Sequence, residues 1–322
     1  QSYEIVEIQA SATELPAGLD ALAVVHPQGV SESLLFAIDQ FVLAGKPLFL
    51  ALDPSSRHFA QQGQRMQMYG GQAQNVASDL PRLLAAWGVA YDNKKVVGDL
   101  EYASMVQTQN GTASFPAWLT LRPESLNKDF IPANGINAMV FIEAGAFTLT
   151  PPAGVEAVPV VESSTRSGPI DAMMMQFGQA ADIGKQGKPD GKKRVLAAML
   201  RGTFKTSFPD GAPKPAESPK PDDKGAAPKP EPKPVDALKE ARQPGAVFLV
   251  ADTDWLMDAY SVQRMPFLGV NAIQPLNDNL AFGTNVLDFL GGSRDLISLR
   301  GKGTSQRPFE VIRRMELAAQ AD

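Results

Sequence analysis

The chain of 322 residues contains no cysteine and only 2 histidines. The absence of cysteine excludes disulfide bonds, thiolate catalysis and cysteine-based metal sites. A histidine-based metal site would need both histidines together with carboxylates, and no spacing in the chain places such a set. We therefore expect neither a bound metal ion nor a cofactor.

Long apolar runs are also missing. None approaches the roughly 20 residues that a helix needs to cross a bilayer, and no signal peptide is visible. The longest candidate, residues 137–149, is interrupted by Glu143 and Gly145. We expect any membrane anchor to lie outside these 322 residues.

A basic excess, which nucleic-acid-binding surfaces usually carry, is absent as well. The formal net charge is −5, so we expect no nucleic-acid partner. The chain has neither the GxGxxG nor the Walker A phosphate-binding motif, and GKGT at 301–304 lacks the upstream glycine. What remains is an ordinary globular composition, 44% apolar and 20% charged.

The clearest boundary in the chain is rich in proline and lysine. Pro209 to Pro234 holds 9 of the 26 prolines and no large apolar residue. Such a segment cannot bury enough apolar surface to offset the entropy lost on ordering. We predict a flexible, exposed insertion at 209–236, with a proline-motif docking site as the alternative. The insertion divides one α/β domain into residues 1–208 and 237–306, followed by a helix at 307–322.

Strand and helix patterns alternate on both sides of the insertion. The runs PLFLAL at 47–52 and AVFLVA at 246–251 are apolar on both faces, as buried parallel strands are. Helices are predicted after Ser31, after Ser78, and from Asp278 to Leu290, whereas 63–75 is interpreted as a mobile loop. The alternation predicts an α/β fold with a mostly parallel, doubly wound sheet and extra strands between 101 and 165.

Polar residues follow both apolar strands directly. Asp252 and Asp254 could hold a divalent cation, but spacing places no third acid, so we favour an N-cap at Thr253 or Asp254. After the other strand, Ser55 or Ser56 could act as a nucleophile, with His58 or His26 as base. The GxSxG elbow is missing, and a turn capped by Asp53 and serine is the favoured interpretation.

Residues 269–308, GVNAIQPLNDNLAFGTNVLDFLGGSRDLISLRGKGTSQRP, resemble the C-terminal signature of GldG-type auxiliary subunits of ABC transporters. Further matching pieces keep the order and spacing of that family from about Tyr3 to Phe309. They are VVHP at 24, IDQFV at 38, LLAAWGV at 83, LRGTFKTSFP at 200 and ADTDWL at 251.

This resemblance implies a flavodoxin-like or glutamine-amidotransferase-like sheet, although amidotransferases need the cysteine that this chain lacks. It also implies a non-catalytic domain at the periplasmic face of the inner membrane. There the domain would bind or scaffold the ABC permease and ATPase subunits of an export or gliding-related system. By the same resemblance, a transmembrane helix follows soon after residue 322.

Two sets of residues are the candidate contact surfaces. For a ligand or partner these are Asp53, Ser55, Asp252, Asp254, Asn277 and Asn279. For the membrane-proximal helix that Pro308 would open, they are Arg307, Arg313 and Arg314. The alternatives are a hydrolase that uses Ser55 or Ser56, or Asp252 with Asp254, and a receptor for a small polar ligand.

Overall fold

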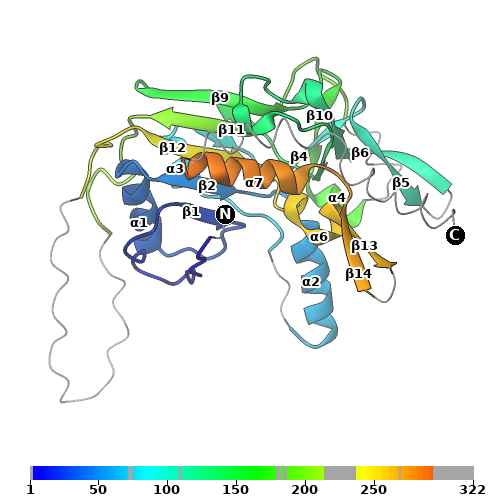
Figure 1. Cartoon of the computed structure of the whole chain (residues 1–322), viewed down its shortest axis with the longest axis horizontal. Helices are drawn as coiled ribbons and strands as arrows, with labels where there is room; N and C mark the ends of the chain where they lie inside the picture. Colours follow the sequence, from blue (N-terminus) through cyan, green and yellow to red (C-terminus); the bar gives the residue numbers. More distant parts are fainter. Residues whose placement is uncertain are drawn as a thin grey trace, which may run out of the picture.

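The computed structural model describes residues 3–71, 75–108, 111–178, 183, 187–213, 237–267 and 270–292. At its centre is a 7-stranded sheet with the order β1-β2-β12-β11-β8-β3, to which β9 adds beside β11 (Figure 1). The strands of this sheet are β1 (Leu22–Val25), β2 (Pro47–Ala51), β3 (Val89–Tyr91), β8 (Phe147–Leu149), β9 (Val155–Glu162), β11 (Val195–Gly202) and β12 (Gly245–Val250).

The sheet is mixed, so the prediction of a mostly parallel, doubly wound sheet is wrong in part. Strands β1, β2 and β12 run parallel, whereas β11 is antiparallel to β12, β9 and β8, and β3 is antiparallel to β8. A parallel neighbour needs a long crossover connection, and a helix supplies one between β1 and β2. The middle of the chain instead builds antiparallel strands. The strand after the insertion, β12, joins the same sheet as predicted.

Helices cover both faces of the central sheet (Figure 1). α1 (Glu32–Leu43) and α3 (Pro81–Ala86) pack on one face, and α7 (Asn279–Leu290) packs on the other. Strand β2 serves both layers, because Leu48 and Leu50 face α1 while Phe49 faces the α7 layer. Burial on both sides explains why this strand is apolar at every position.

The predicted limits of α1 are confirmed. Ser31 Oγ accepts a hydrogen bond from Leu34 N at 3.0 Å, which caps the first turn. Gly45 follows the helix with a φ of 82°, a left-handed conformation that glycine adopts without steric cost.

The predicted cap of α3 is wrong. The helix begins at Pro81, whose ring presets the helical φ, and its N-cap residue Leu80 makes no side-chain cap. Ser78 Oγ accepts instead from Asp53 N at 3.0 Å. The serine therefore ties the loop before α3 to the end of β2.

Smaller sheets and short helices complete the described part of the chain. The strands pair as β5-β6-β7, β4-β10 and β13-β14. These strands are β4 (Lys95–Asp99), β5 (Ala103–Thr108), β6 (Gly111–Leu121), β7 (Met139–Ile142), β10 (Ser167–Asp171), β13 (Val262–Phe267) and β14 (Val270–Pro275). The other helices are α2 (Arg57–Met68), α4 (Met173–Phe177), α6 (Asp258–Ser261), η1 (Pro123–Ser125), η2 (Ile131–Ala133) and η3 (Asp254–Leu256).

Helix α2 corrects the interpretation of residues 63–75 as a loop. The helix continues to Met68 and projects from the body in the same direction as the β13–β14 hairpin (Figure 1). The residues from 61 to 68 are mostly glutamine, methionine and arginine, which favour a helix. Gly63, the one weak helix former there, is buried.

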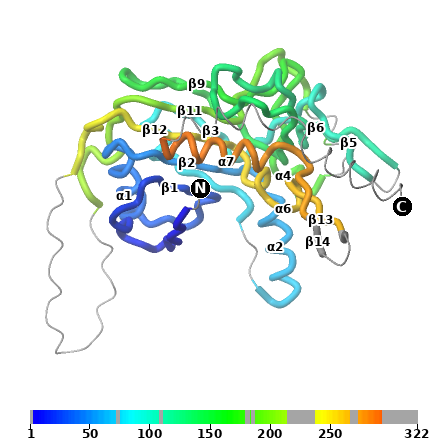
Figure 2. Tube along the Cα trace, in the orientation of Figure 1, coloured from blue at the N-terminus to red at the C-terminus, as the bar shows by residue number. Residues whose placement is uncertain are grey.

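The predicted insertion lies outside the described residues from 214 to 236, but both of its flanks are described. They leave the body at the same end of the molecule (Figure 2). Thr206 N donates to Lys239 O at 2.9 Å, and Ala241 N donates to Phe204 O at 2.8 Å. The two flanks are therefore held together by the folded part of the chain.

We predict that replacing residues 214–236 with a short glycine-serine linker changes the melting temperature by less than about 2 °C. Val235 is the only apolar residue of the segment larger than proline, and the flanks of the segment are already paired. Thermal unfolding followed by circular dichroism measures this change. A cooperative loss of the fold would show that the segment packs on the body.

The predicted helix at 307–322, with Arg307, Arg313 and Arg314, lies outside the described residues. Among the helices that the structure does describe, none combines the length and the apolar character that a membrane crossing requires.

Candidate functional site

Three aspartates meet where β2 and β12 end. The two strands are parallel neighbours, with Ala51 beside Val250, so the residues that follow them leave the sheet at the same edge. Asp53, Asp252 and Asp254 are all 0% exposed, and one carboxylate oxygen from each lies within 4.8 Å of the others. Spacing in the sequence placed no third acid beside Asp252 and Asp254, whereas the structure places Asp53 there. The strand register, which spacing along the chain cannot reveal, brings Asp53 to the other two.

Asp53 joins the ends of the two strands. One carboxylate oxygen accepts from Ser55 N at 2.8 Å. The other accepts from Thr253 N at 2.8 Å and from Thr253 Oγ1 at 2.7 Å. This aspartate forms the predicted turn after β2 and also holds the segment after β12.

Asp252 holds a third element at the same edge. Its Oδ1 accepts from Asp254 N at 2.7 Å and from Trp255 N at 3.2 Å, which fixes the turn into η3. Its Oδ2 accepts from Ile142 N at 2.7 Å, at the end of β7. The small β5-β6-β7 sheet is therefore attached to the central sheet through this carboxylate.

Asp254 caps a helix, but not the one expected. We predicted that Thr253 or Asp254 caps the helix that follows, and η3 has no side-chain cap. Asp254 instead accepts from Arg57 N at 2.6 Å, His58 N at 3.1 Å and Ser56 Oγ at 3.0 Å. These donors belong to Ser56, the N-cap residue of α2, and to the first turn of the helix, where a negative charge is favourable.

Burial favours the protonated form of these aspartates. It raises the pKa of Asp53 well above its usual value, and the neighbouring charge of Asp254 adds to the effect. The pKa of Asp252 is raised in the same way, by burial and then by Asp53. For Asp254, burial raises the pKa while the α2 donors oppose the shift. Carboxylates this close share protons because they cannot all ionise.

The same oxygens could also coordinate Mg²⁺ or Ca²⁺, which prefer carboxylate ligands. Every one of the six carboxylate oxygens, however, already accepts a protein hydrogen bond.

We predict that Asp252 and Asp254 do not form an essential metal site. Titration calorimetry with Mg²⁺ and with Ca²⁺ near pH 7 is expected to show no tight, stoichiometric binding. The matched control is Asp254→Ala, which is expected to give the same heats as the unaltered protein. Stoichiometric binding that disappears in Asp254→Ala would overturn this prediction.

A second polar group lies beside the cluster. Ser55 Oγ donates to Glu143 Oε2 at 2.7 Å, and Arg57 Nε donates to Glu143 Oε1 at 2.5 Å. Glu143 is 1% exposed and has a φ of 54°, which few residues other than glycine adopt. Burial raises its pKa and the charge of Arg57 opposes that shift. Sequence reasoning missed this residue, although an acid that interrupts an apolar run was its signal.

Neither serine has a histidine as its base. Ser55 donates to Glu143 and Ser56 donates to Asp254. The buried ring of His26 stacks on Phe59, and its Nε2 lies 3.3 Å from Asn75 O. Within the part of the chain that the structure describes, no hydrogen bond joins a histidine ring to Ser55 or Ser56. The hydrolase alternative therefore lacks its expected pair of nucleophile and base.

The two predicted asparagines do not join the acids. Asn279 Oδ1 accepts from Val140 N at 2.9 Å and its amide donates to Val140 O at 2.8 Å, which fixes the start of α7 to β7. Asn277 donates to Tyr260 O at 2.7 Å and accepts from Asn279 N at 3.0 Å. Both side chains shape the turn before α7.

Comparison with known proteins gives one family. The sequence model of the family described as "ABC-type uncharacterized transport system" matches residues 1–286. No curated protein matches. Among solved structures, the mmIFT52 N-terminal domain is similar at 11% identity and a TM-score of 0.42, with 89% of this chain and 83% of that chain covered. A likeness that weak supports no argument about function. Because the family model matches most of its length, the chain belongs to the ABC-type uncharacterized transport system family of ABC transporter auxiliary proteins.

Proposed function

We propose that this chain is a non-catalytic, periplasmic domain of a membrane-anchored auxiliary subunit, which binds or scaffolds the other subunits of an ABC export complex. Family membership supports the association with an ABC system. The resemblance to GldG-type subunits supports the location and the export or gliding-related role. One structural observation supports the proposal that the domain is non-catalytic. The polar side chains at the carboxyl ends of β2 and β12 are hydrogen-bonded to one another.

The hydrogen bonds of these side chains join the ends of several strands to one helix. Ser55 is 4% exposed and Ser56 is 0% exposed, and each hydroxyl donates to a buried carboxylate. A nucleophile must reach its substrate and must lose its proton to a base during the reaction. The three aspartates meanwhile join β2, β12, β7 and α2 through their hydrogen bonds. These bonds hold the strand ends together, and they engage the hydroxyls of both Ser55 and Ser56.

Two projecting elements supply the contact surface in this proposal. Near the end of α2, Met68 is 83% exposed and Tyr69 is 92% exposed. On the β13–β14 hairpin, which extends in the same direction (Figure 1), Ile273 is 64% exposed. Large exposed apolar side chains that gather on a projection are typical of protein contact sites. We propose that these two elements contact the permease.

Crosslinking tests the membrane-proximal orientation. A photoreactive residue at position 313 or 314 of the full-length protein, in native membranes, is expected to capture lipid or the permease. The matched control is the same residue at Lys205, which lies just beyond β11 on the globular body. Capture of water-soluble proteins alone from 313 and 314, with no hydrophobic segment encoded beyond Asp322, would contradict the proposed location.

A further inference from the structure

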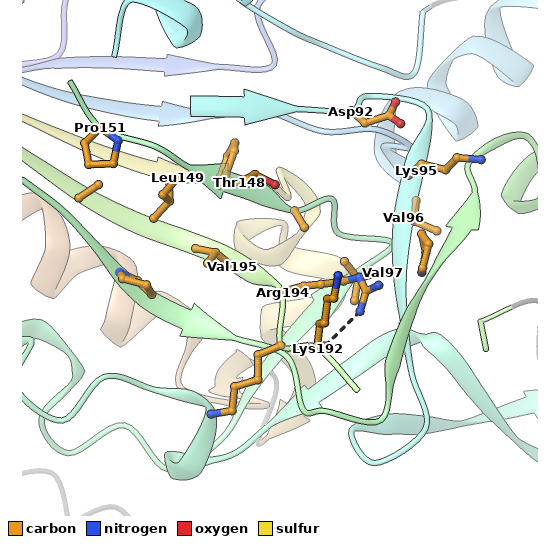
Figure 3. A pocket seen from close by; sticks show the side chains of 16 residues that line it. Asp92, Lys95, Val96, Val97, Thr148, Leu149, Pro151, Lys192, Arg194 and Val195 are labelled. Carbon is orange, nitrogen blue, oxygen red and sulfur yellow. Dashed lines mark hydrogen bonds between the residues drawn. The ribbon is translucent and has the colours of Figure 1, made fainter. Parts of the chain in front are cut away.

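A cavity of about 790 Å³ opens where strands β8, β9 and β11 meet β4 and β10 (Figure 3). The cavity is separate from the candidate site, because its lining does not include Asp53, Glu143, Asp252 or Asp254. Its volume lies within the range of small-molecule sites in proteins. We propose that this cavity binds an anionic amphiphile, a molecule with a phosphate or carboxylate head and a single aliphatic tail.

The floor of the cavity is apolar. Leu149, Ala157 and Val195 line it, and they belong to the sheet face that α1 and α3 cover elsewhere. All three remain half-buried, so apolar surface is available to a ligand at this point. An aliphatic tail placed on this floor would be removed from water, which is favourable in proportion to the apolar area covered.

Basic residues gather at one end of the cavity. The lining contains four cations, Lys95, Lys192, Lys193 and Arg194, and one acid, Asp92. Figure 3 shows the side chains of Lys192 and Arg194 beside each other near Val97, whereas Pro151 lies at the other end. A ligand that fits this arrangement has its negative charge at one end and its apolar part along the strands.

The ion pairs already present at the basic end leave room for such a head group. Lys95 pairs with Asp171 at 3.2 Å, and Lys193 pairs with Glu162 at 3.9 Å. Each of these lysine side chains is nearly half exposed. Exposed pairs of this kind contribute little free energy, so exchange with a ligand anion costs little. Lys192 Nζ forms no hydrogen bond or ion pair to any residue that the structure describes.

Arg194 gives the basic end a fixed guanidinium group, whose Nη1 also donates to Asp190 Oδ1 at 3.2 Å and to Lys192 O at 3.1 Å. Its side chain is 14% exposed, and its Nη1 donates to Ser167 O and to Ser167 Oγ, both at 2.9 Å. The pair with Asp190 at 2.7 Å holds the other side of the guanidinium. A cation positioned in this way before a ligand arrives loses little conformational freedom on binding.

Calorimetric titration of the whole chain with three probes tests the proposal. Dodecyl phosphate below its micelle concentration is expected to bind with one equivalent. Dodecyl maltoside, which has the same tail and a neutral head, and inorganic phosphate, which has no tail, are each expected to bind at least about tenfold more weakly. Equal binding of all three probes, or no saturable binding of dodecyl phosphate, would overturn the proposal.

Two variants separate the head and tail contributions. Lys192→Gln combined with Lys193→Gln is expected to weaken dodecyl phosphate binding about tenfold and to reduce its salt dependence. Ala157→Trp fills the floor and is expected to abolish binding. Lys205→Gln, beyond the opposite end of β11, is the matched control and is expected to bind as the unaltered protein does. An unchanged affinity in the double lysine variant would contradict the assignment.

The head-and-tail chemistry could come from a membrane lipid or from a soluble molecule, and vesicles distinguish them. If vesicles that contain lysophosphatidylglycerol, which has one aliphatic tail, bind the protein and dodecyl phosphate competes with them, the ligand is a membrane lipid. If dodecyl phosphate binds and the vesicles do not, the ligand is a soluble amphiphile. Both outcomes support the site. Binding of neither probe overturns it.

Discussion

Asp254→Ala is expected to lower the free energy of unfolding by about 2–4 kcal/mol, because it removes a helix cap and leaves buried donors without an acceptor. The carboxylate accepts from Ser56 Oγ, Arg57 N and His58 N. Removal of its charge also relieves repulsion with Asp53, which offsets part of the loss. Urea denaturation measures the net change, and hydrogen exchange is expected to show faster exchange in α2.

The comparison variants make this result interpretable. Asp258→Ala removes an aspartate that is 69% exposed at its side chain and forms a surface pair with Arg264, so it is expected to change stability by less than about 0.5 kcal/mol. Asp254→Asn keeps one acceptor oxygen, and its loss of unfolding free energy is expected to lie between those of Asp254→Ala and Asp258→Ala. A loss in Asp254→Ala as small as that in Asp258→Ala would show that Asp254 does not hold α2.

The free energy of unfolding is expected to fall as the pH rises from about 5 to about 8, because Asp53 and Asp252 bind protons more tightly in the folded chain than in the unfolded chain. A group with a raised folded pKa contributes its full stability below its unfolded pKa, which is near 4 for aspartate. That contribution is lost as the pH rises toward the folded pKa. Each such group can change stability by up to about 1.4 kcal/mol per pH unit.

The difference between two proteins isolates this effect. Buried His26 has a lowered pKa and acts in the opposite sense at mildly acidic pH, but it contributes equally to the wild-type chain and to a variant. Asp252→Asn is expected to be less stable than the wild type at about pH 5 and to lose less stability by about pH 8. Asp190→Asn, at an exposed acid with a lowered pKa, is the control and is expected to keep the wild-type slope in this range. Equal slopes in the wild type and Asp252→Asn would contradict the shared-proton account.

Local sequence pattern was enough to predict the elements with strong signals. The two runs that are apolar on both faces became the buried strands β2 and β12, and the helix predicted from Asp278 is α7. Both signals reflect how residues pack against near neighbours, which periodicity records directly. The loop assigned to residues 63–75 was wrong for 63–68, because that assignment followed the glutamine- and glycine-rich composition, whereas glutamine, methionine and arginine favour a helix.

The candidate site depended on contacts that periodicity does not record. Asp53 meets Asp252 because β2 and β12 are in register, although 193 residues (52–244) separate the two strands in the chain. Glu143 enters the site from the end of β7, which a hydrogen bond from Ile142 N attaches to Asp252. The antiparallel half of the sheet was missed for the same reason. Strand direction is decided by how distant segments pair, and the apolar pattern of a buried strand is compatible with both directions.

Isolation of the tagged full-length gene product from its own membranes, with quantitative mass spectrometry of what accompanies it, tests the proposed function most directly. The proposal predicts that the permease and ATPase subunits of one ABC system are recovered in a fixed ratio to the tagged protein. It predicts the same ratio for Ser55→Ala, because this serine has a structural role. Recovery of the tagged protein without either ABC subunit would contradict the proposal.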